Sequence, residues 1–226
     1  MEALMELSGV TKMFRSEPPV RPLDGLDLRV GAGEVVAVTG VSGKGKSTLL
    51  NVMGGLLRPD EGSVLFKGED VCRASAGRLD ALHRQGVGFV FQSPYLFQAL
   101  TARENLVFAR KAARARADEE RVDDMLERFG LADRADHLPC ELSVGQKRRL
   151  VVVRTLLADH EVILADEPTN DLDEAWSDFV FGQFKDFAAT GGRAVVVVTH
   201  DQGYARLADT VYELDGGVLH DADARA

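Results

Sequence analysis

The sequence predicts a single α/β domain with a mainly parallel sheet, an antiparallel β layer near the N-terminus and an inserted α-helical subdomain. Its 226 residues, 45% of them hydrophobic, suffice for one substantial core. Apolar runs at 35–38, 162–165 and 194–198 predict strands buried on both faces, which is typical of parallel sheets covered by helices. Charge and helical periodicity increase in the middle of the chain. We therefore expect the helical subdomain at about 93–158, between core segments at about 1–92 and 159–226.

The elements before the middle of the chain follow from local patterns. Alternation of Leu26, Leu28 and Val30 with charged residues predicts a half-buried strand of the antiparallel layer. The buried strand at 35–38 is followed by a glycine-rich stretch and then by a helical pattern from Lys46 to about Gly54.

The later elements are predicted in the same way. A helix in the middle is indicated by apolar residues at helical spacing: Val122, Met125, Leu126 and Phe129. A further amphipathic helix is indicated by a stripe that we interpret as core: Trp176, Phe179, Val180, Phe184 and Phe187. Residues 211–214 and 218–219 predict a terminal hairpin around Asp215-Gly216-Gly217.

Charge and cysteine content exclude several classes of protein. The formal net charge of −9 argues against a protein that coats nucleic acid, so we expect no nucleic-acid partner. Cys72 and Cys140 lack metal-ligand spacing and are expected to be reduced, buried thiols of a cytosolic protein. The basic residues of the middle region are interpreted as a solvated helical face: Arg103, Arg110, Lys111, Arg114, Arg116 and Arg121.

No targeting or membrane segment is expected. The first residues lack the basic and apolar regions of a signal peptide. No apolar run approaches the length of a membrane-spanning helix. Any membrane role is therefore expected to come through a partner protein.

The segment Gly40 to Ser47, GVSGKGKS, matches the phosphate-loop pattern G-x-x-x-x-G-K-[ST] in full. It lies between a predicted buried strand and a predicted helix, which is the context that this loop requires. The glycines let backbone N–H groups turn towards phosphate oxygens, and the helix start favours negative charge. Lys46 is expected to reach the outer phosphates and Ser47 to bind Mg²⁺, so the α/β fold is predicted to be a P-loop NTPase core.

A second pair of candidate residues, Asp166 and Glu167, ends the apolar run at 162–165. Ligands of open α/β folds bind at the carboxyl edge of the sheet, where this strand delivers both carboxylates. We expect Asp166 to help hold Mg²⁺ and Glu167 to orient and polarise the attacking water. On its own, such a pair is often only a solvated turn.

Two further features allow both a structural and a functional interpretation. His200 follows the strand predicted at 194–198, which we expect to neighbour the two nucleotide-site strands, so its imidazole could hydrogen-bond a γ-phosphate. Ser143 is a good helix N-cap, and Gly145 permits close backbone approach, which would form a second anion-binding helix start. An ordinary structural histidine and an ordinary capped helix remain the alternatives.

Taken in order, these motifs resemble the nucleotide-binding domains of ABC transporters over nearly the whole chain. Residues 40–47 resemble Walker A, 162–167 Walker B with its catalytic glutamate, and 142–146 the signature motif. Gln92 resembles the Q-loop glutamine, and residues 170–173 resemble the D-loop.

The resemblance implies a role for each matching residue. His200 corresponds to the switch histidine and Phe14 to the aromatic that stacks on adenine. The implied ATP ligands are Phe14, Gly40, Val41, Ser42, Gly43, Lys44, Gly45, Lys46, Ser47, Thr48, Ser143, Gly145, Gln146 and Asp173. The implied catalytic residues are Glu167, His200 and Gln92, and the implied Mg²⁺ ligands are Ser47, Gln92 and Asp166.

Within that family the chain resembles the lipoprotein-releasing and macrolide-exporter branch, through residues 49–56, 87–92, 100–105 and 165–169. It departs from the family pattern at three places. Val144 stands where the signature motif usually has glycine, and Lys44 where a small residue is common. Asn170-Asp171 replaces the Gly-Asn usual in this branch.

The resemblance also implies partners. Two copies are expected to bind head-to-tail, with ATP on Walker A of one copy meeting Ser143 and Gly145 of the other. Transmembrane permease subunits are expected to contact Gln92 and the segment 94–100, which places the chain on the cytoplasmic face of the inner membrane. The alternatives are a soluble or division-associated ABC ATPase that regulates a non-transport complex, and a small kinase of another P-loop class.

Overall fold

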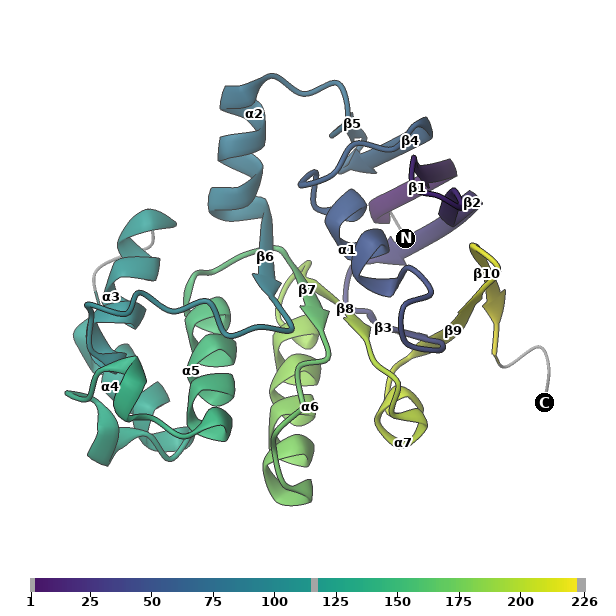
Figure 1. The fold of residues 1–226 in the computed structure, drawn as a ribbon. Coiled ribbons are helices and arrows are strands. Elements are labelled where there is room, and N and C mark those ends of the chain that lie inside the picture. Colours follow the sequence, from purple (N-terminus) through teal and green to yellow (C-terminus); the bar gives the residue numbers. More distant parts are fainter. Residues whose placement is uncertain (1–2, 115–117, 223–226) are drawn as a thin grey trace.

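Two sheets organise the computed structural model, which describes residues 3–114 and 118–222 (Figure 1). The smaller sheet is antiparallel with strand order β2-β1-β4-β5. Its strands are β1 (Ala3–Phe14), β2 (Val20–Gly31), β4 (Glu61–Phe66) and β5 (Glu69–Asp70). The predicted antiparallel layer is therefore confirmed, and Leu26, Leu28 and Val30 bury their side chains on one face of β2.

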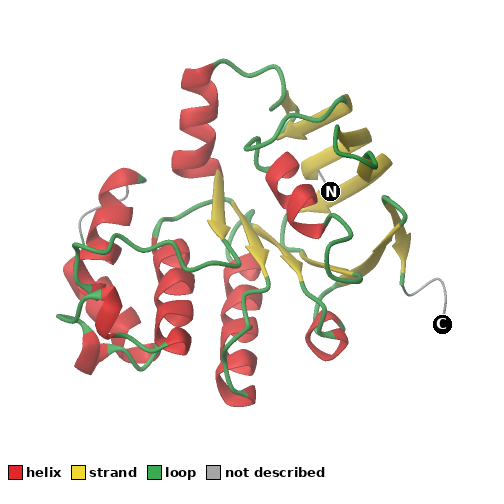
Figure 2. Ribbon diagram, viewed as in Figure 1, coloured by secondary structure: helices red, strands yellow, loops and turns green. Residues whose placement is uncertain are grey.

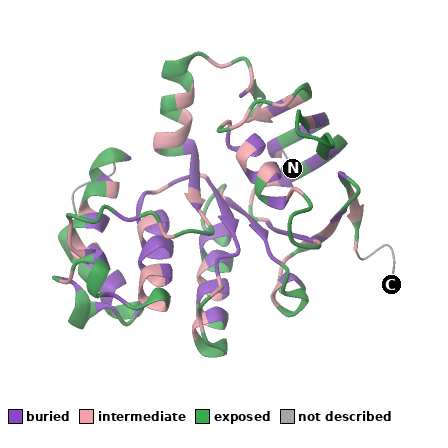
Figure 3. Cartoon of the chain, viewed as in Figure 1, coloured by how far each residue is buried: buried purple, intermediate pink, exposed green. Residues whose placement is uncertain are grey.

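The larger sheet has six strands in the order β10-β9-β3-β8-β7-β6. Its strands are β3 (Val35–Thr39), β6 (Val87–Val90), β7 (Val162–Asp166), β8 (Ala194–Val198), β9 (Thr210–Asp215) and β10 (Val218–Asp221). All pairings are parallel except the hairpin of β9 and β10, which turns at 216–217 as predicted. Every residue of β3, β7 and β8 is buried, which explains their unbroken apolar sequences (Figure 3).

Two long helices cover one face of the six-stranded sheet, and the smaller sheet together with one short helix covers the other (Figure 2). Successive side chains of a strand point to opposite faces, so alternate residues of β8 enter different cores. Val195 and Val197 pack with α5 (Val144–Leu157) and α6 (Glu174–Ala189). Val196 and Val198 pack with α1 (Lys46–Met53) and the antiparallel sheet.

The remaining helices connect these layers. They are α2 (Ala76–Ala81), the π-helix η1 (Leu82–Gly86), α3 (Ala102–Ala112), α4 (Glu119–Arg128), the 3-10 helices η2 (Ala132–Arg134) and η3 (Pro139–Glu141), and α7 (Gln202–Ala205). The segment expected to form a helical subdomain contains α3, α4 and α5, which contact one another. Its division from the core stays a prediction. Among the helices of the described residues, none combines the length and apolar character needed to cross a membrane.

Two expectations about individual side chains were wrong. Arg110 is only 4% exposed and donates a hydrogen bond to the carbonyl oxygen of Leu157, so it does not belong to a solvated face. Arg116 of the same basic set lies outside the described residues. Cys140 is exposed rather than buried, because it lies in the short helix η3 at the surface. Cys72 is half-buried, and neither cysteine forms a disulfide.

A buried histidine lies under β6, at the edge opposite the predicted nucleotide site. His160 packs so closely on Gly88 that a Cβ atom there would lie 2.2 Å from its Cδ2. Burial lowers the pKa of His160 from 6.5 to about 4; Asp159 opposes this shift, while Arg193 and His83 add to it. Its Nδ1 has no hydrogen-bond partner among the described residues. His160 is therefore neutral in the folded protein at neutral pH.

The lowered pKa of His160 predicts that the folded protein is less stable in acid. Between pH 6.5 and 4 the unfolded chain binds a proton that the folded chain does not. Stability is therefore fully present above pH 6.5, falls as the pH drops, and levels off below about pH 4. The predicted loss is about 3 kcal/mol in the free energy of unfolding. Urea unfolding between pH 7.5 and 4.5 should show a flatter pH profile for His160→Asn than for the wild type. Equal slopes for the two proteins would contradict this assignment.

Candidate functional site

The carboxyl ends of four neighbouring strands gather most of the predicted site residues at one edge of the larger sheet. Strand β8 lies between β3 and β7, and β6 pairs with β7 on its other side. The loop at 40–45 follows β3, His200 follows β8, Glu167 follows β7, and Gln92 follows β6. The expectation that the strand before His200 neighbours the other two is confirmed. Such an edge is where open α/β sheets bind ligands.

The loop after β3 needs its glycines for steric reasons. Gly40, Gly43 and Gly45 have φ of 143°, 78° and 109°, which side chains rarely tolerate. A Cβ atom on Gly40 would lie 2.6 Å from the carbonyl oxygen of Leu214, and one on Gly45 would lie 2.7 Å from that of Pro22. The loop is therefore packed tightly between β2 and β9.

Most side chains of this loop point to solvent. Val41, Ser42 and Lys44 are exposed, and Gly45 caps α1 without a side-chain hydrogen bond. The first turn of α1, which includes Thr48, carries no acidic residue. An uncapped helix start of this kind offers free N–H groups and a favourable field to an anion such as a phosphate.

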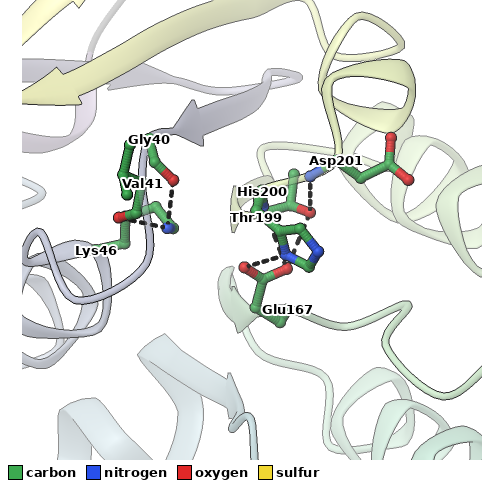
Figure 4. Close-up of polar contacts among 7 residues, drawn as sticks. All are labelled: Gly40, Val41, Lys46, Glu167, Thr199, His200 and Asp201. Carbon is green, nitrogen blue, oxygen red and sulfur yellow. Dashed lines mark hydrogen bonds and ion pairs between the residues drawn. The ribbon is translucent and has the colours of Figure 1, made fainter.

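Lys46 is the one loop side chain that turns inward. It is 7% exposed, and its Nζ donates to the carbonyl oxygens of Gly40 at 2.7 Å and Val41 at 3.3 Å (Figure 4). The ammonium group thus lies inside the loop, where a phosphate chain wrapped by the same loop would come within its reach.

Ser47 connects this loop to the end of β7. Its hydroxyl lies near the carboxyl group of Asp166, which is buried at the last position of the strand. Burial raises the pKa of Asp166; the nearby Ser47 hydroxyl and the charges of Lys46 and Arg148 oppose this shift, whereas Glu167 adds to it. Two segments that are more than a hundred residues apart in sequence therefore meet at one point.

The Ser47 hydroxyl and the Asp166 carboxylate are hard oxygen donors of the kind that Mg²⁺ prefers. In the described part of the chain no three His, Cys, Asp or Glu side chains come together as a metal cage. One carboxylate and one hydroxyl fit a Mg²⁺ ion that takes its other ligands from water and from substrate phosphates, which is the usual arrangement for this ion.

Glu167 is held by the end of β8. Its Oε2 accepts hydrogen bonds from Thr199 Oγ1 at 3.0 Å and from the His200 backbone N–H at 3.3 Å. Its Oε1 lies 2.9 Å from His200 Nδ1 (Figure 4). The residue is buried and has a φ of 48°, an unusual conformation for a residue with a side chain. These contacts fix both the backbone and the carboxylate in a strained arrangement of the kind found at functional sites.

The second predicted anion site is formed by the start of α5. Ser143 caps the helix, with its Oγ accepting from the Gln146 N–H at 3.2 Å and its own N–H donating to Gln146 Oε1 at 2.8 Å. The predicted N-cap is confirmed, and Gln146 is used to complete the capping box. A Cβ atom on Gly145 would lie 3.0 Å from the carbonyl oxygen of Asp171, so this helix start touches the loop after β7.

Three other predicted residues lie around this framework. Phe14 is the exposed end of β1 and pairs with Val20, two residues before the proline that packs on Gly45. Asp173 caps α6 by accepting a hydrogen bond from the Trp176 N–H at 2.9 Å. Gln92 is exposed in the loop after β6, and its role as a metal ligand stays a prediction.

Thr199 and Arg148 belong to the site but were not predicted from the sequence. Arg148 is 2% exposed and contacts the loops after β6 and β7. A signal for it was present, because Arg148 lies at helical spacing with the buried residues Val152 and Thr155. Arginine on the buried face of a helix implies partners elsewhere in the chain.

Comparisons with known proteins agree with this site. The sequence profile of the family described as "ABC transporter" matches residues 23–170. The lipoprotein-releasing system ATP-binding protein LolD of Bacteroides thetaiotaomicron is 40% identical, over 96% of this chain and 100% of its own length. The macrolide export ATP-binding/permease protein MacB 1/2 of Paracoccus denitrificans is 44% identical, over 96% of this chain but only 33% of its own length. The chain thus spans about a third of the MacB relatives that it matches.

Among solved structures, the ATP-binding cassette MJ0796 has the same fold. Its dimeric post-hydrolysis structure, bound to ADP and Pi, gives a TM-score of 0.88 at 33% identity over 96% of both chains. A second dimeric structure, described as a bacterial ABC transporter cassette, gives a TM-score of 0.86 at 34% identity. The predicted architecture of P-loop core, antiparallel layer and helical insertion is confirmed by these matches.

The steric fit of the loop predicts the effect of adding one methyl group. Gly45→Ala should weaken ATP binding about tenfold or more, because it combines left-handed backbone strain with a clash against Pro22. Gly77→Ala is a suitable control, since a Cβ atom there meets nothing within 4 Å. Titration calorimetry measures both affinities. Wild-type affinity in Gly45→Ala would show that the loop does not bind the nucleotide.

Proposed function

The chain belongs to the ABC transporter family and is an ATP-binding cassette of the kind that hydrolyses ATP; from this we propose that it powers an exporter or a lipoprotein-releasing system through ATP-driven dimerisation. The observation that carries the proposal is that β3 and β7 flank β8, which brings Ser47 of the phosphate loop near Asp166 of the acidic strand end. Relatives of both named types match nearly the whole chain.

The residues of the loop bind and orient the triphosphate in the proposed reaction. Backbone N–H groups at 40–47 surround the phosphates, and Lys46 turns from its carbonyl partners towards the outer phosphates. Ser47 and Asp166 would hold Mg²⁺, with Gln92 as a further ligand from the loop after β6. When bound, this ion neutralises charge that develops on the β- and γ-phosphates.

Glu167 orients the attacking water in this proposal. Its carboxylate is anchored by Thr199 and paired with the ring of His200, so its lone pairs are already directed. His200 has a largely exposed side chain beside this carboxylate, which suits it to contact a γ-phosphate as well. Phe14, exposed at the end of β1, is the proposed stacking partner of adenine.

A second copy of the chain completes the site in the proposed head-to-tail dimer. The capped start of α5 presents Ser143, Val144 and Gly145, of which Val144 is 56% exposed. A helix start that reaches the surface fits a phosphate brought by a partner. The MJ0796 structures are dimeric, which supports an assembly of two copies. Hydrolysis removes the γ-phosphate that links the copies, and the dimer opens.

Permease subunits are the proposed membrane partners. Tyr95 is 65% exposed in the segment after Gln92, and Phe97 and Phe108 are also exposed with their ring centroids 4.6 Å apart. Exposed aromatics of this kind are typical of protein interfaces. Leu96, by contrast, is buried and packs internally. A permease bound here would hold the chain on the cytoplasmic face of the inner membrane.

Replacing the proposed catalytic carboxylate should trap the dimer. Glu167→Gln blocks hydrolysis but keeps the phosphate contacts, so with saturating Mg-ATP its mass in solution should double from 24.6 kDa. Light scattering after size exclusion measures this mass. The double variant Lys46→Ala/Glu167→Gln should stay monomeric, since its loop lacks the phosphate-binding ammonium group. A Glu167→Gln protein that stays monomeric with ATP would contradict the head-to-tail scheme.

Restoring glycine at the start of α5 should speed the reaction. Val144 carries a β-branched side chain where the partner's phosphate is proposed to approach. Val144→Gly should raise kcat of ATP hydrolysis about threefold, which corresponds to about 0.7 kcal/mol in the barrier. Steady-state phosphate release measures kcat. An unchanged or lower kcat would mean that Val144 does not restrain the site.

A further inference from the structure

Arg148 is a buried cation between the loop after β6 and the loop after β7, which both border the proposed active site. It lies one turn into α5 and is 2% exposed. Burying a guanidinium is costly unless its N–H groups find acceptors, so its contacts must account for its position.

The contacts of Arg148 all go to two loops. Its Nη1 donates to the carbonyl oxygen of Phe91 at 2.9 Å, and its Nη2 donates to that of Gln92. Its Nε donates to the carbonyl oxygen of Asn170 at 3.3 Å, and Nη2 lies 3.5 Å from Oδ2 of Asp171. One guanidinium therefore joins the loop after β6 to the loop after β7.

Charges around Arg148 extend this connection to the catalytic carboxylates. Burial lowers the pKa of Arg148, and the nearby carboxylates of Asp171, Asp166 and Glu167 oppose that shift. The same cation opposes the rise in the pKa of Asp166 that burial causes. Arg148 is thus close enough to interact electrostatically with both acidic residues at the end of β7.

The planar guanidinium makes these contacts mutually dependent. Its donors have a fixed fork geometry. A loop that shifts relative to α5 must therefore either break its hydrogen bonds to Arg148 or move the guanidinium, which would break the hydrogen bonds of the other loop. Gly145 adds a second point of contact, because a Cβ atom there would lie only 3.0 Å from the carbonyl oxygen of Asp171. The loop after β7 is therefore fixed to the α5 start at two places.

We propose that Arg148 is a positioning residue for ATP hydrolysis, which holds the loops of Gln92 and of Asn170-Asp171 in one arrangement with the start of α5. This inference rests on the proposed function. Through this link, phosphate bound at the α5 start of one copy is coupled to the loops beside the hydrolytic site of the same chain. Asp171, which departs from the usual family pattern, is the acidic partner in this link.

Steady-state kinetics of four proteins test the proposal: wild type, Arg148→Gln, Asp171→Asn and the double variant. Arg148→Gln should lower kcat about tenfold and change KM by less than about threefold, because misplaced loops affect the chemical step more than nucleotide binding. Asp171→Asn should lower kcat about threefold. The double variant should match Arg148→Gln within about twofold, since both substitutions remove the same link.

Arg110→Gln is the matched control. It removes another buried guanidinium, one that donates a hydrogen bond to the carbonyl oxygen of Leu157 at the far end of α5. It should lower the melting temperature and leave kcat within about twofold of wild type. If Arg148→Gln does not fold, Asp171→Asn decides the matter, because its half-exposed side chain can change without unfolding the core.

Three results would overturn the inference: wild-type kcat in Arg148→Gln, a loss confined to KM, or wild-type kcat in Asp171→Asn. These results differ from a failure of the proposed function. If the wild type does not hydrolyse ATP at all, the proposed function fails. If the wild type hydrolyses ATP and both single variants match it, only the role of Arg148 fails.

Discussion

The proximity of Ser47 to Asp166 is the constraint on which the site depends. It joins the start of α1 to the end of β7, and the parallel sheet makes it possible by ending β3, β8 and β7 at one edge. Because β8 lies between the other two, the residues that follow it, Thr199 and His200, reach Glu167. The residues proposed for phosphate binding, metal binding and activation of water are thereby gathered at one edge of the sheet.

Much of this arrangement could be predicted from sequence. Strands such as β3 and β8 are buried on both faces, so their sequences are uninterrupted apolar runs. Such runs are easy to recognise in a sequence. The phosphate loop could be predicted because its glycines meet local steric demands, as the φ of 109° at Gly45 illustrates. Ser143 could be predicted as an N-cap because capping depends on residues only three positions apart.

Other features depend on residues that are distant in sequence. Arg110 resembles an ordinary surface arginine until the carbonyl group that receives its hydrogen bond is known. Helical spacing indicates that Arg148 is buried, but it does not indicate which carbonyl groups Arg148 contacts. Cys140 is exposed because it lies in the short helix η3 at the surface. Cysteine is an apolar residue type, and residue type alone predicts that it is buried. Thr199 gave no signal because its role depends on the neighbouring strand that brings Glu167 within 3.0 Å. Long-range contacts, rather than local preferences, decide these positions.

The most direct test of the account is whether Ser47 and Asp166 share one magnesium-bound triphosphate. Titration calorimetry can measure ATP affinity of the wild type and of Asp166→Asn, each with Mg²⁺ and with EDTA. The account predicts that Mg²⁺ increases the ATP affinity of the wild type and that Asp166→Asn loses this increase while it still binds ATP in EDTA. An equal effect of Mg²⁺ on both proteins would contradict the account, because the phosphate loop and the end of β7 would then not act on the same ligand.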